Sequence, residues 1–409
     1  MPDVTTLNNN AVYSIVNAAR TQALGGGSSQ QIASLDIHDI IDAGGSEDVI
    51  GSREAFTRSL INVLVKNWFT DTSYRTQYND PFFEDEARFG AITQLISVTV
   101  PDVKAASNWT SITSGTTQLG AYTIYLPIVD TKYYGKSASY ELPIAITDNQ
   151  WDTAFKSADE LTGFIAYILM CVDNALVVHL EDMSNMNRNN FIAEKYKAAT
   201  AVSPTPGVHV VDLLGGYVAA HGDTTKDFSV ADFLSTPEAL IYASEQIALY
   251  TDYIGKMSTM FNTANKPRFT PDERKVLQVL SAFEKRLQYH ALSDTYNQQL
   301  ASLPGHQSVP FWQGFGNGGS WSEVSKIIVK PTSYDATVST DPTTVSNVVA
   351  FLADKWAVMH TVVSRRVGVK RFDPEEITQY YYQFTDRYLN DLTQNAVVFI
   401  LKAYTAPTG

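Results

Sequence analysis

The sequence predicts an α+β protein organised around one very long helix. From Trp151 to Met183, apolar residues recur at steps of three, four or seven, which is the pattern of a helix of roughly 30 residues, on the order of 45–50 Å long. The chain before this helix, from about Tyr74 to Thr147, carries strand and turn signals, and strand character returns after Asn347. Few globular helices are this long, so we expect it to be the spine of a flat or elongated subunit.

The C-terminal strands contain three consecutive tyrosines, Tyr380, Tyr381 and Tyr382. Successive side chains of a strand point to opposite faces, so Tyr380 and Tyr382 share one face and Tyr381 takes the other. Aromatic side chains on both faces predict a sheet that is covered on both sides, since a half-exposed strand would alternate with polar residues.

The composition is that of a large protein with much buried surface. The chain has 409 residues, of which 44% are hydrophobic and only 18% charged, with 22 tyrosines and 19 phenylalanines. This length allows two to three domains. Abundant aromatics with few charges are typical of interfaces between subunits, although a large, slightly apolar soluble protein fits the composition equally well.

The net charge of −13 argues against sequence-independent binding of nucleic acid, because such binding rests on positive charge. One basic cluster stands out: Arg365, Arg366, Lys370 and Arg371. A solvated strand face or ion-pair partners are the more usual reading of such a cluster.

The single cysteine, Cys171, excludes an intramolecular disulfide framework and a cysteine-based zinc site, and it fits a reducing compartment. The N-terminal residues lack the basic and apolar segments of a signal peptide. The longest apolar run, Leu161–Val172, is too short to cross a bilayer. We therefore expect a soluble protein that is made in a cytoplasm and has no membrane partner.

The region before the long helix is predicted to hold an arm, a short helix and a ribbon. Residues 1 to about 55 are rich in Gly, Ser and polar residues and are interpreted as an extended arm, and Arg53–Phe69 has helical spacing. Thr117–Asp130 and Ser137–Asp148 are expected to pair as a two-stranded ribbon, joined by Thr131–Lys136 at its tip. The prolines within them, Pro127 and Pro143, are expected at edge positions.

Two helices are predicted after the long helix. The segments that start at Thr236 and Thr270 both open with Thr-Pro-acidic and continue with helical spacing, the proline taking the first helical position. Residues 200–235 are mixed, and Gly305 to about Thr344 is Gly-, Pro- and Thr-rich and is interpreted as loop.

Two glycine motifs are weak matches to nucleotide-binding patterns. Gly135-Lys136-Ser137 resembles the end of a phosphate-binding loop, but Asp130 stands where that loop needs glycine and a strand follows. "GFGNGG" (Gly314–Gly319) matches G-x-G-x-x-G, and Asp335 follows at a suitable distance. No long helix separates them, so a flexible loop is the better interpretation.

No arrangement of residues points to catalysis or to a metal. The carboxylates Glu84, Asp85 and Glu86 are consecutive and are better explained as a solvated turn than as a cation site. The seven histidines show no close pairing or H-E-x-x-H spacing: His38, His179, His209, His221, His290, His306 and His360. We predict no catalytic, cofactor-binding or metal-binding residue, and no cofactor.

Three stretches of the sequence resemble one viral family. They are "YSIVNAAR" (Tyr13–Arg20), the passage from Leu142 to Leu176, and the passage from Ala353 to Ile400 that contains the three tyrosines. All three are similar to the major head proteins of phi29-type podoviruses, and the order of elements resembles that of the HK97-like major capsid proteins of tailed bacteriophages.

The resemblance implies an HK97-like capsid fold with the following parts. They are an N-terminal arm (1–55), a leading helix (56–73), an extended E-loop (74–148), a peripheral (P) domain (149–235) with the spine helix at 151–183, an axial (A) domain (approximately 236–350), and C-terminal strands of the P domain (351–409). On this plan the spine helix covers one face of the tyrosine strand, and a neighbouring subunit can contact the other.

The function implied by the resemblance is a non-enzymatic shell protein of the virion. It would assemble with itself as pentamers and hexamers into an icosahedral or prolate head around double-stranded DNA, in the cytoplasm of a bacterial host. Scaffolding and portal proteins are implied partners, with head fibre or decoration proteins as further candidates, and the acidic wall would touch packaged DNA only weakly and non-specifically. Two alternatives stay open: an encapsulin-like compartment shell, and an enzyme with a site within 200–345.

Overall fold

The computed structural model describes most of the chain from residue 81 onward. The described residues are 81–84, 93–98, 129–134, 137–147, 158–201, 204–221, 224, 226–291, 303–313, 319–331, 341–372 and 376–405. The chain divides into two compact units. Of the described residues, the first unit holds 137–183 and 362–387, and the second holds 81–134, 184–361 and 388–405. The expected arm (1–55) and leading helix (56–73) lie outside the described residues.

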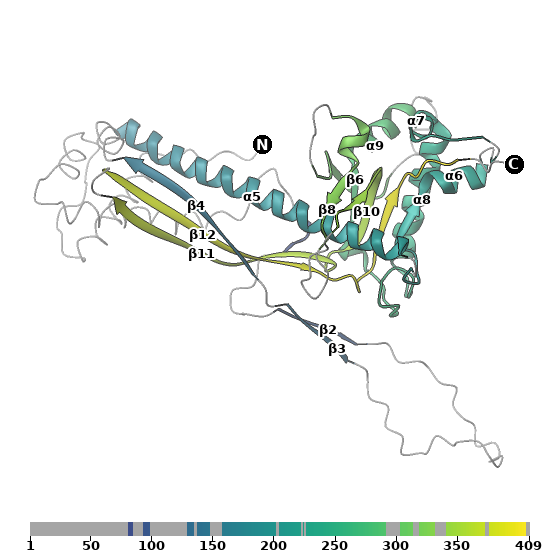
Figure 1. The fold of residues 1–409 in the computed structure, drawn as a ribbon, viewed down its shortest axis with the longest axis horizontal. Coiled ribbons are helices and arrows are strands. Elements are labelled where there is room, and N and C mark those ends of the chain that lie inside the picture. Colours follow the sequence, from purple (N-terminus) through teal and green to yellow (C-terminus); the bar gives the residue numbers. More distant parts are fainter. Residues whose placement is uncertain are drawn as a thin grey trace, which may run out of the picture. The chain divides into compact units, whose positions relative to one another are not determined.

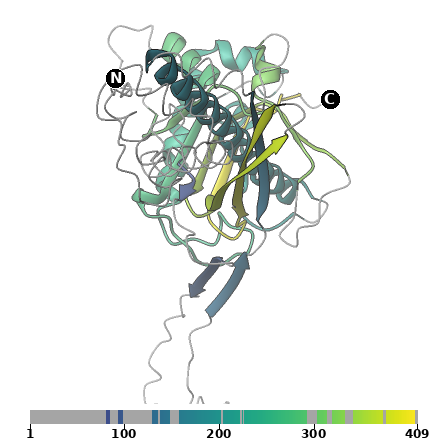
Figure 2. The same cartoon turned by 90° about the vertical axis from the view of Figure 1, so that its left-hand side faces the viewer.

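The first unit consists of one long helix and a sheet. The helix α5 runs over Ala158–Thr200 and is 43 residues long, and its part up to Met183 belongs to this unit. The strands are β4 (Ala138–Thr147), most of β11 (Val358–Phe372) and most of β12 (Ile377–Asn390), paired in the order β11-β12-β4. The short strand β1 (Phe83–Glu84) pairs with the start of β11, at residues that belong to the second unit. The helix lies along one face of these strands (Figures 1 and 2). Tyr140 of β4 contacts it, since its ring lies 4.3 Å from that of His179 and its hydroxyl donates to Met183 Sδ at 3.3 Å.

The tyrosine strand is two-faced, as the sequence predicts. In the antiparallel register of β12 and β4, Tyr380 lies opposite Ile144, Tyr381 opposite Pro143, and Tyr382 opposite Leu142. Tyr380 and Tyr382 are buried, whereas Tyr381 between them is partly exposed. Among the described strands β4 is at the edge of the sheet, which confirms the predicted edge position of Pro143.

The expected end of the long helix at Met183 is wrong, because α5 continues to Thr200. The stretch Ser184–Asn190 is polar and looks like a helix end in the sequence. The second unit provides hydrogen-bond partners for these polar side chains: Asn189 Nδ2 and Arg188 Nη2 donate to the backbone oxygen of Trp312 at 2.7 and 3.2 Å. The following Phe191, Ile192 and Ala193 are fully buried in the core of this unit.

The core of the second unit is a five-stranded sheet. Its order is β5-β13-β10-β6-β7, with β5 over Val210–Asp212, β6 over Lys275–Leu280, β7 over Gln307–Val309, β10 over Val348–Asp354 and β13 over Ala396–Ile400. Every residue of β10 and β13 is buried, as expected for central strands covered on both faces. Helices α6 (Leu213–His221), α7 (Val230–Ser235), α8 (Pro237–Tyr253) and α9 (Ser281–Arg286) surround the sheet (Figure 1). The second unit also contains short elements: β1 (Phe83–Glu84), a 3₁₀ turn (Asp272–Arg274), a π-turn (Leu287–Ala291), α10 (Trp321–Val324), β8 (Ile327–Val329) and β9 (Thr343–Val345).

One of the two helices predicted after the long helix is confirmed, and the other is confirmed only in its second half. The first is α8, with Pro237 at its first turn. The first half of the second segment is wrong: it forms a turn at Asp272–Arg274 and then strand β6, which pairs with β10 and β7. Its second half is helical, as α9 and the π-turn at Leu287–Ala291. Short apolar runs such as "KVLQVL" fit a helix and a buried strand equally well. Here the pairing with β10 and β7 makes the run a strand.

The C-terminal strands do not form one sheet. The strands β11 and β12 belong to the sheet with β4, whereas β10 and β13 pair with each other in the five-stranded sheet. The segment 351–409, expected to be one group of strands, therefore contributes to both sheets.

The predicted ribbon has a different pairing. A two-stranded ribbon is present, but its strands are β2 (Thr93–Val98) and β3 (Val129–Tyr134), which are antiparallel (Figure 1). The strand β4, expected to be the partner of the segment that ends at Asp130, pairs with β12 instead. Residues 131–134, expected at the ribbon tip, are strand residues of β3.

Candidate assembly surface

The β2–β3 ribbon presents two chemically different faces. In its register, Gln94 lies opposite Tyr133, Ile96 opposite Thr131, and Val98 opposite Val129. These pairs share one face, because side chains alternate along a strand. Leu95 opposite Lys132 and Ser97 opposite Asp130 form the other face.

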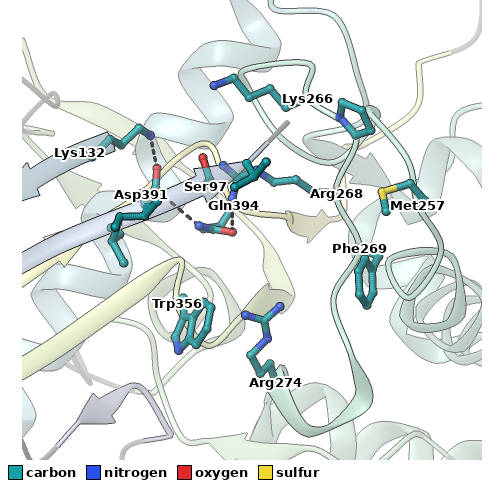
Figure 3. Close-up of a pocket in the computed structure, with 14 residues that line it drawn as sticks. Ser97, Lys132, Met257, Lys266, Arg268, Phe269, Arg274, Trp356, Asp391 and Gln394 are labelled. Carbon is teal, nitrogen blue, oxygen red and sulfur yellow. Dashed lines mark hydrogen bonds and ion pairs between the residues drawn. The ribbon is translucent and has the colours of Figure 1, made fainter. Parts of the chain in front are cut away.

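The second of these faces is anchored by two ion pairs within the same unit. Lys132 Nζ donates to Asp391 Oδ1 at 2.7 Å and to Thr393 Oγ1 at 2.7 Å. One residue pair along, Lys266 donates to the carboxylate of Asp130. Asp391 is 3% exposed and Lys132 is 17% exposed, so the first pair is largely removed from solvent. Figure 3 shows Lys132 and Asp391 pointing toward each other.

Both carboxylates are held in their charged form. Burial alone would raise the pKa of Asp391, but the hydrogen bond and the charge of Lys132, with Thr393, outweigh it and leave the pKa below its ordinary value of 3.8. The hydrogen bond and charge of Lys266 lower the pKa of Asp130. The ribbon is therefore tied electrostatically to the turn after β12 and to the loop that holds Lys266.

The opposite face of the ribbon, which we call the outer ribbon face, is apolar and open to solvent. Its apolar side chains are Ile96, Val98, Val129 and Tyr133, with exposures of 63%, 57%, 53% and 61%, and the polar Gln94 and Thr131 lie among them. Side chains of this size are seldom grouped on a solvent-facing surface unless something covers them. A two-stranded ribbon also has little core of its own and needs a surface to lie on.

A lysine is buried behind the anchor. Lys195 of α5 is fully buried, and its Nζ donates to the backbone oxygen of Phe261 at 2.9 Å. Burial lowers its pKa to about 7, against the favourable charge of Asp391. Burial, together with the charge of Lys195, lowers the pKa of His209 to about 4. The anchor thus lies close to groups that titrate well away from their usual range.

An open cavity of about 250 Å³ borders the ribbon in the same unit. Its lining includes Leu95 to Val98 of β2, the Lys132–Asp391 pair, and residues of the loops 257–274 and 354–357. Figure 3 shows Arg268 and Gln394 beside the anchor and Trp356 beside Arg274.

The motifs that the sequence analysis set aside are scattered. Ser137 is described, but Gly135 and Lys136 are outside the described residues, as are Gly314, Gly316, Asp335, Asp85 and Glu86. Glu84 lies in β1, opposite Thr361 of β11. In the described part of the chain, no group of three or more His, Cys, Asp or Glu residues is arranged to hold a metal ion. Within the same residues, no helix is long and apolar enough to cross a membrane.

The basic cluster of the sequence lies on β11. Arg366 and Lys370 are exposed there, two strand positions on either side of Gly368, as expected for a solvated strand face. The anchor residues, by contrast, were not singled out. Asp391 is followed by Thr393 and Gln394, which both bond its carboxylate, and this turn chemistry is the only sequence signal that points to it.

Comparison with known proteins identifies the family. The family model described as "Phi29-like phage major capsid protein" matches residues 16–400, nearly the whole chain. The chain belongs to this family, and its role is that of a major capsid protein, which forms the shell of the phage head and is a component of the virion. No curated protein matches the chain.

Solved structures of phage capsids are similar in part. The capsid structure of Staphylococcus phage Andhra matches with a TM-score of 0.49 at 10% identity, over 80% of this chain and 84% of that chain. The mature capsid of bacteriophage PhiM1 matches with a TM-score of 0.40 at 9% identity, over 81% and 90%. The capsid of cyanophage P-SCSP1u matches with a TM-score of 0.39 at 12% identity, over 83% and 94%.

Proposed function

We propose that this capsid protein builds an HK97-like shell of pentamers and hexamers around double-stranded DNA, and that the outer ribbon face is one of the surfaces by which neighbouring subunits hold each other. The observation that carries the proposal is the asymmetry of the ribbon. One face is fixed to its own subunit by two ion pairs, and the other exposes four large side chains.

The named parts of the HK97-like plan can be assigned on this basis. The ribbon β2–β3 is the base of the E-loop, α5 is the spine helix, and the sheet β11-β12-β4 with α5 belongs to the P domain. The five-stranded sheet and its helices would make up the A domain, which then includes β10 and β13 from the C-terminal part of the chain. Membership of a phage capsid family favours this shell over the encapsulin-like alternative, and a structural role over an enzyme.

The proposed partners follow from the same role. A shell of this kind is assembled in the host cytoplasm around a scaffolding protein and a portal protein, and head fibres or decoration proteins would attach to it afterwards. A subunit with a net charge of −13 would touch packaged DNA only weakly, because like charges repel.

The test places a charge on the outer ribbon face. We expect Ile96→Asp and Tyr133→Asp to leave the thermal unfolding of the unassembled subunit unchanged, since both side chains are exposed, and to abolish or strongly reduce shell formation. Electron microscopy and sedimentation velocity would measure the assembly. Ile328→Asp, at a large exposed side chain on β8 of the same unit, is the matched control and should assemble. Normal shells from both ribbon variants would overturn the proposal.

A further inference from the structure

The cavity beside the ribbon has an unusual apolar lining. Met257, Phe269 and Trp356 border it and are 50%, 49% and 42% exposed. Met257 and Phe269 come from the loop 257–274 and Trp356 from the turn after β10, and all three border the one cavity (Figure 3). Grouped exposed side chains of this size mark a surface that binds something apolar.

The rim of the same cavity is cationic. Lys132, Lys266, Arg268 and Arg274 line it, against the single carboxylate of Asp391. Three of the four cations form ion pairs: Lys132 with Asp391, Lys266 with Asp130, and Arg274 with Asp354 at 3.6 Å. The guanidinium of Arg274 also lies 4.0 Å from the ring centroid of Trp356.

Arg268 differs from the other three. Its Nη1 donates to the neutral amide oxygen of Gln394 at 2.7 Å, and in the described part of the chain no carboxylate forms an ion pair with it. A guanidinium that holds only an amide retains donors for an incoming carboxylate, and it suits a planar carboxylate particularly well. The cavity therefore fits an occupant that interleaves apolar side chains with carboxylates.

One segment of this chain has that chemistry. Leu35–Ile50 reads "LDIHDIIDAGGSEDVI" and contains five acidic residues and no lysine or arginine. Its first half places Ile37, Ile40 and Ile41 among Asp36, Asp39 and Asp42. The segment lies outside the described residues, and its sequence matches the cavity in charge and apolarity.

We propose that the cavity lined by Met257, Arg268, Phe269 and Trp356 binds the acidic segment Leu35–Ile50 of a neighbouring copy, with isoleucines against the apolar lining and aspartates at Arg268. The choice of a neighbouring copy rests on the proposed function, because the cavity is bordered by β2, whose outer face is proposed to meet another subunit. The match in chemistry does not depend on it.

The first experiment measures binding without assembly. A fluorescein-labelled peptide of residues 33–50 is titrated into full-length, unassembled protein that carries Asp36→Asn, Asp39→Asn and Asp42→Asn, so that its own segment does not compete. We expect saturable binding by fluorescence anisotropy, weakened roughly tenfold by Arg268→Gln, as for the loss of one charge-assisted hydrogen-bonding partner. Lys256→Gln, at an exposed cation outside the cavity lining, is the matched control and should leave the affinity unchanged.

Other outcomes of this titration overturn the proposal. The proposal is wrong if the peptide does not bind, or if a peptide in which the same three aspartates are asparagines binds equally well. It is also wrong if a single-stranded oligonucleotide displaces the peptide at similar concentration, because the cavity would then be a nucleic-acid site. Because the readout is peptide affinity on unassembled protein, it is independent of whether the outer ribbon face drives assembly.

The second experiment identifies the occupant in the shell. The photo-cross-linking residue p-benzoylphenylalanine replaces Phe269, and isotopically labelled and unlabelled chains are mixed before assembly. After irradiation, mass spectrometry should find cross-links from position 269 to peptides within 35–50, including pairs of one labelled and one unlabelled chain. The same residue at Tyr289, which is 77% exposed and outside the lining, should not give these links. Cross-links to another segment, or only within single chains, would contradict the proposal.

Discussion

Lys132 and Asp391 are 259 residues apart in the sequence and form an ion pair of 2.7 Å that fixes the ribbon to the turn between β12 and β13. The carboxylate also accepts hydrogen bonds from Thr393 and Gln394, so the same group shapes the turn and holds the ribbon. A projecting element of a capsid subunit is thereby connected, through one buried carboxylate, to the strands of the second unit.

Replacing Lys132 by methionine should destabilise the subunit. The methionine keeps much of the apolar stem but removes the cationic hydrogen-bond donor of the buried Asp391 carboxylate. The carboxylate keeps its neutral donors and the more distant charge of Lys195, so we expect a cost of about 2 kcal/mol, typical of a hydrogen bond to a charged group. Urea unfolding of the unassembled chain would measure this cost. The matched control is Lys256→Met, at an exposed lysine of the same unit, which should have almost no effect.

This result would reverse the expectation from the sequence. A ribbon tip at Lys132–Lys136 predicts that exchanging these residues for a Gly/Ser linker leaves subunit stability unchanged, whereas the ion pair to Asp391 predicts a clear loss. If Lys132→Met unfolds at the same urea concentration as the wild type, the ion pair contributes nothing to subunit stability, and the expectation of an unchanged stability holds.

The anchor should also release in acid. The pKa of Asp391 lies below its ordinary value of 3.8 in the folded chain, so the pair contributes stability above about pH 4 and loses it as the pH falls through the lowered folded pKa. The difference in unfolding free energy between wild type and Lys132→Met should therefore shrink between pH 5 and pH 3. A difference that stays constant over this range would mean that Asp391 does not titrate there.

Much of the first unit could be predicted from the sequence, because its elements are long and periodic. The segment with regular apolar spacing is a helix in the structure, and the side chains of β12 alternate in burial as the sequence predicts. The end of α5 could not be predicted, since the polar stretch Ser184–Asn190 makes its contacts with Trp312, more than 120 residues away in the sequence, and these contacts have no local sequence signal. The strand β6 could not be predicted because its last four residues, Leu277–Leu280, are all buried, so the segment lacks the alternation of a half-exposed strand.

The pairing of the ribbon strands could not be predicted from the sequence for a different reason. The strands β2 and β3 are more than 30 residues apart and β4 and β12 more than 200, and local pattern does not choose between possible partners for a strand of suitable composition. The anchor residues Lys132 and Asp391 share this difficulty. Each looks like an ordinary surface charge until the fold brings the two together.

The tyrosine strand offers a test of its two faces. Tyr380 and Tyr382 are 1% and 4% exposed, so truncation of either to alanine should cost about 3–5 kcal/mol, as for other buried aromatics. Tyr381 is partly exposed and its Cβ lies near Gly368 of β11, so Tyr381→Ala should cost clearly less. Thermal unfolding of the three variants would rank them.

The three positions serve as controls for one another, because they share residue type and strand. Equal destabilisation by all three substitutions would contradict the two-faced strand. If Tyr381→Ala reduces shell formation without lowering subunit stability, this face is also a contact between copies, which the partly exposed ring permits.

Lys195 should make the subunit more stable at alkaline pH. Its folded pKa of about 7 lies below the ordinary value of 10.5, so the unfolded chain binds more protons between these limits and the unfolding free energy rises with pH across them. The rise is on the order of a few kcal/mol, at about 1.4 kcal/mol per pH unit. Urea unfolding of the unassembled chain at pH 7 and pH 9.5 would measure it.

Lys195→Met is the variant that isolates this effect. The methionine fills the buried site without a charge, and the oxygen of Phe261 still accepts the backbone N–H of Ala396 at 3.0 Å, so no buried acceptor is left unpaired. We expect the variant to be as stable as the wild type or more stable at pH 7, and to lose the gain between pH 7 and 9.5. The remaining charged groups near this site, Asp391 and His209, titrate below pH 7 and add nothing to the gain. A variant that keeps the full alkaline gain would show that a group other than Lys195 is responsible for it.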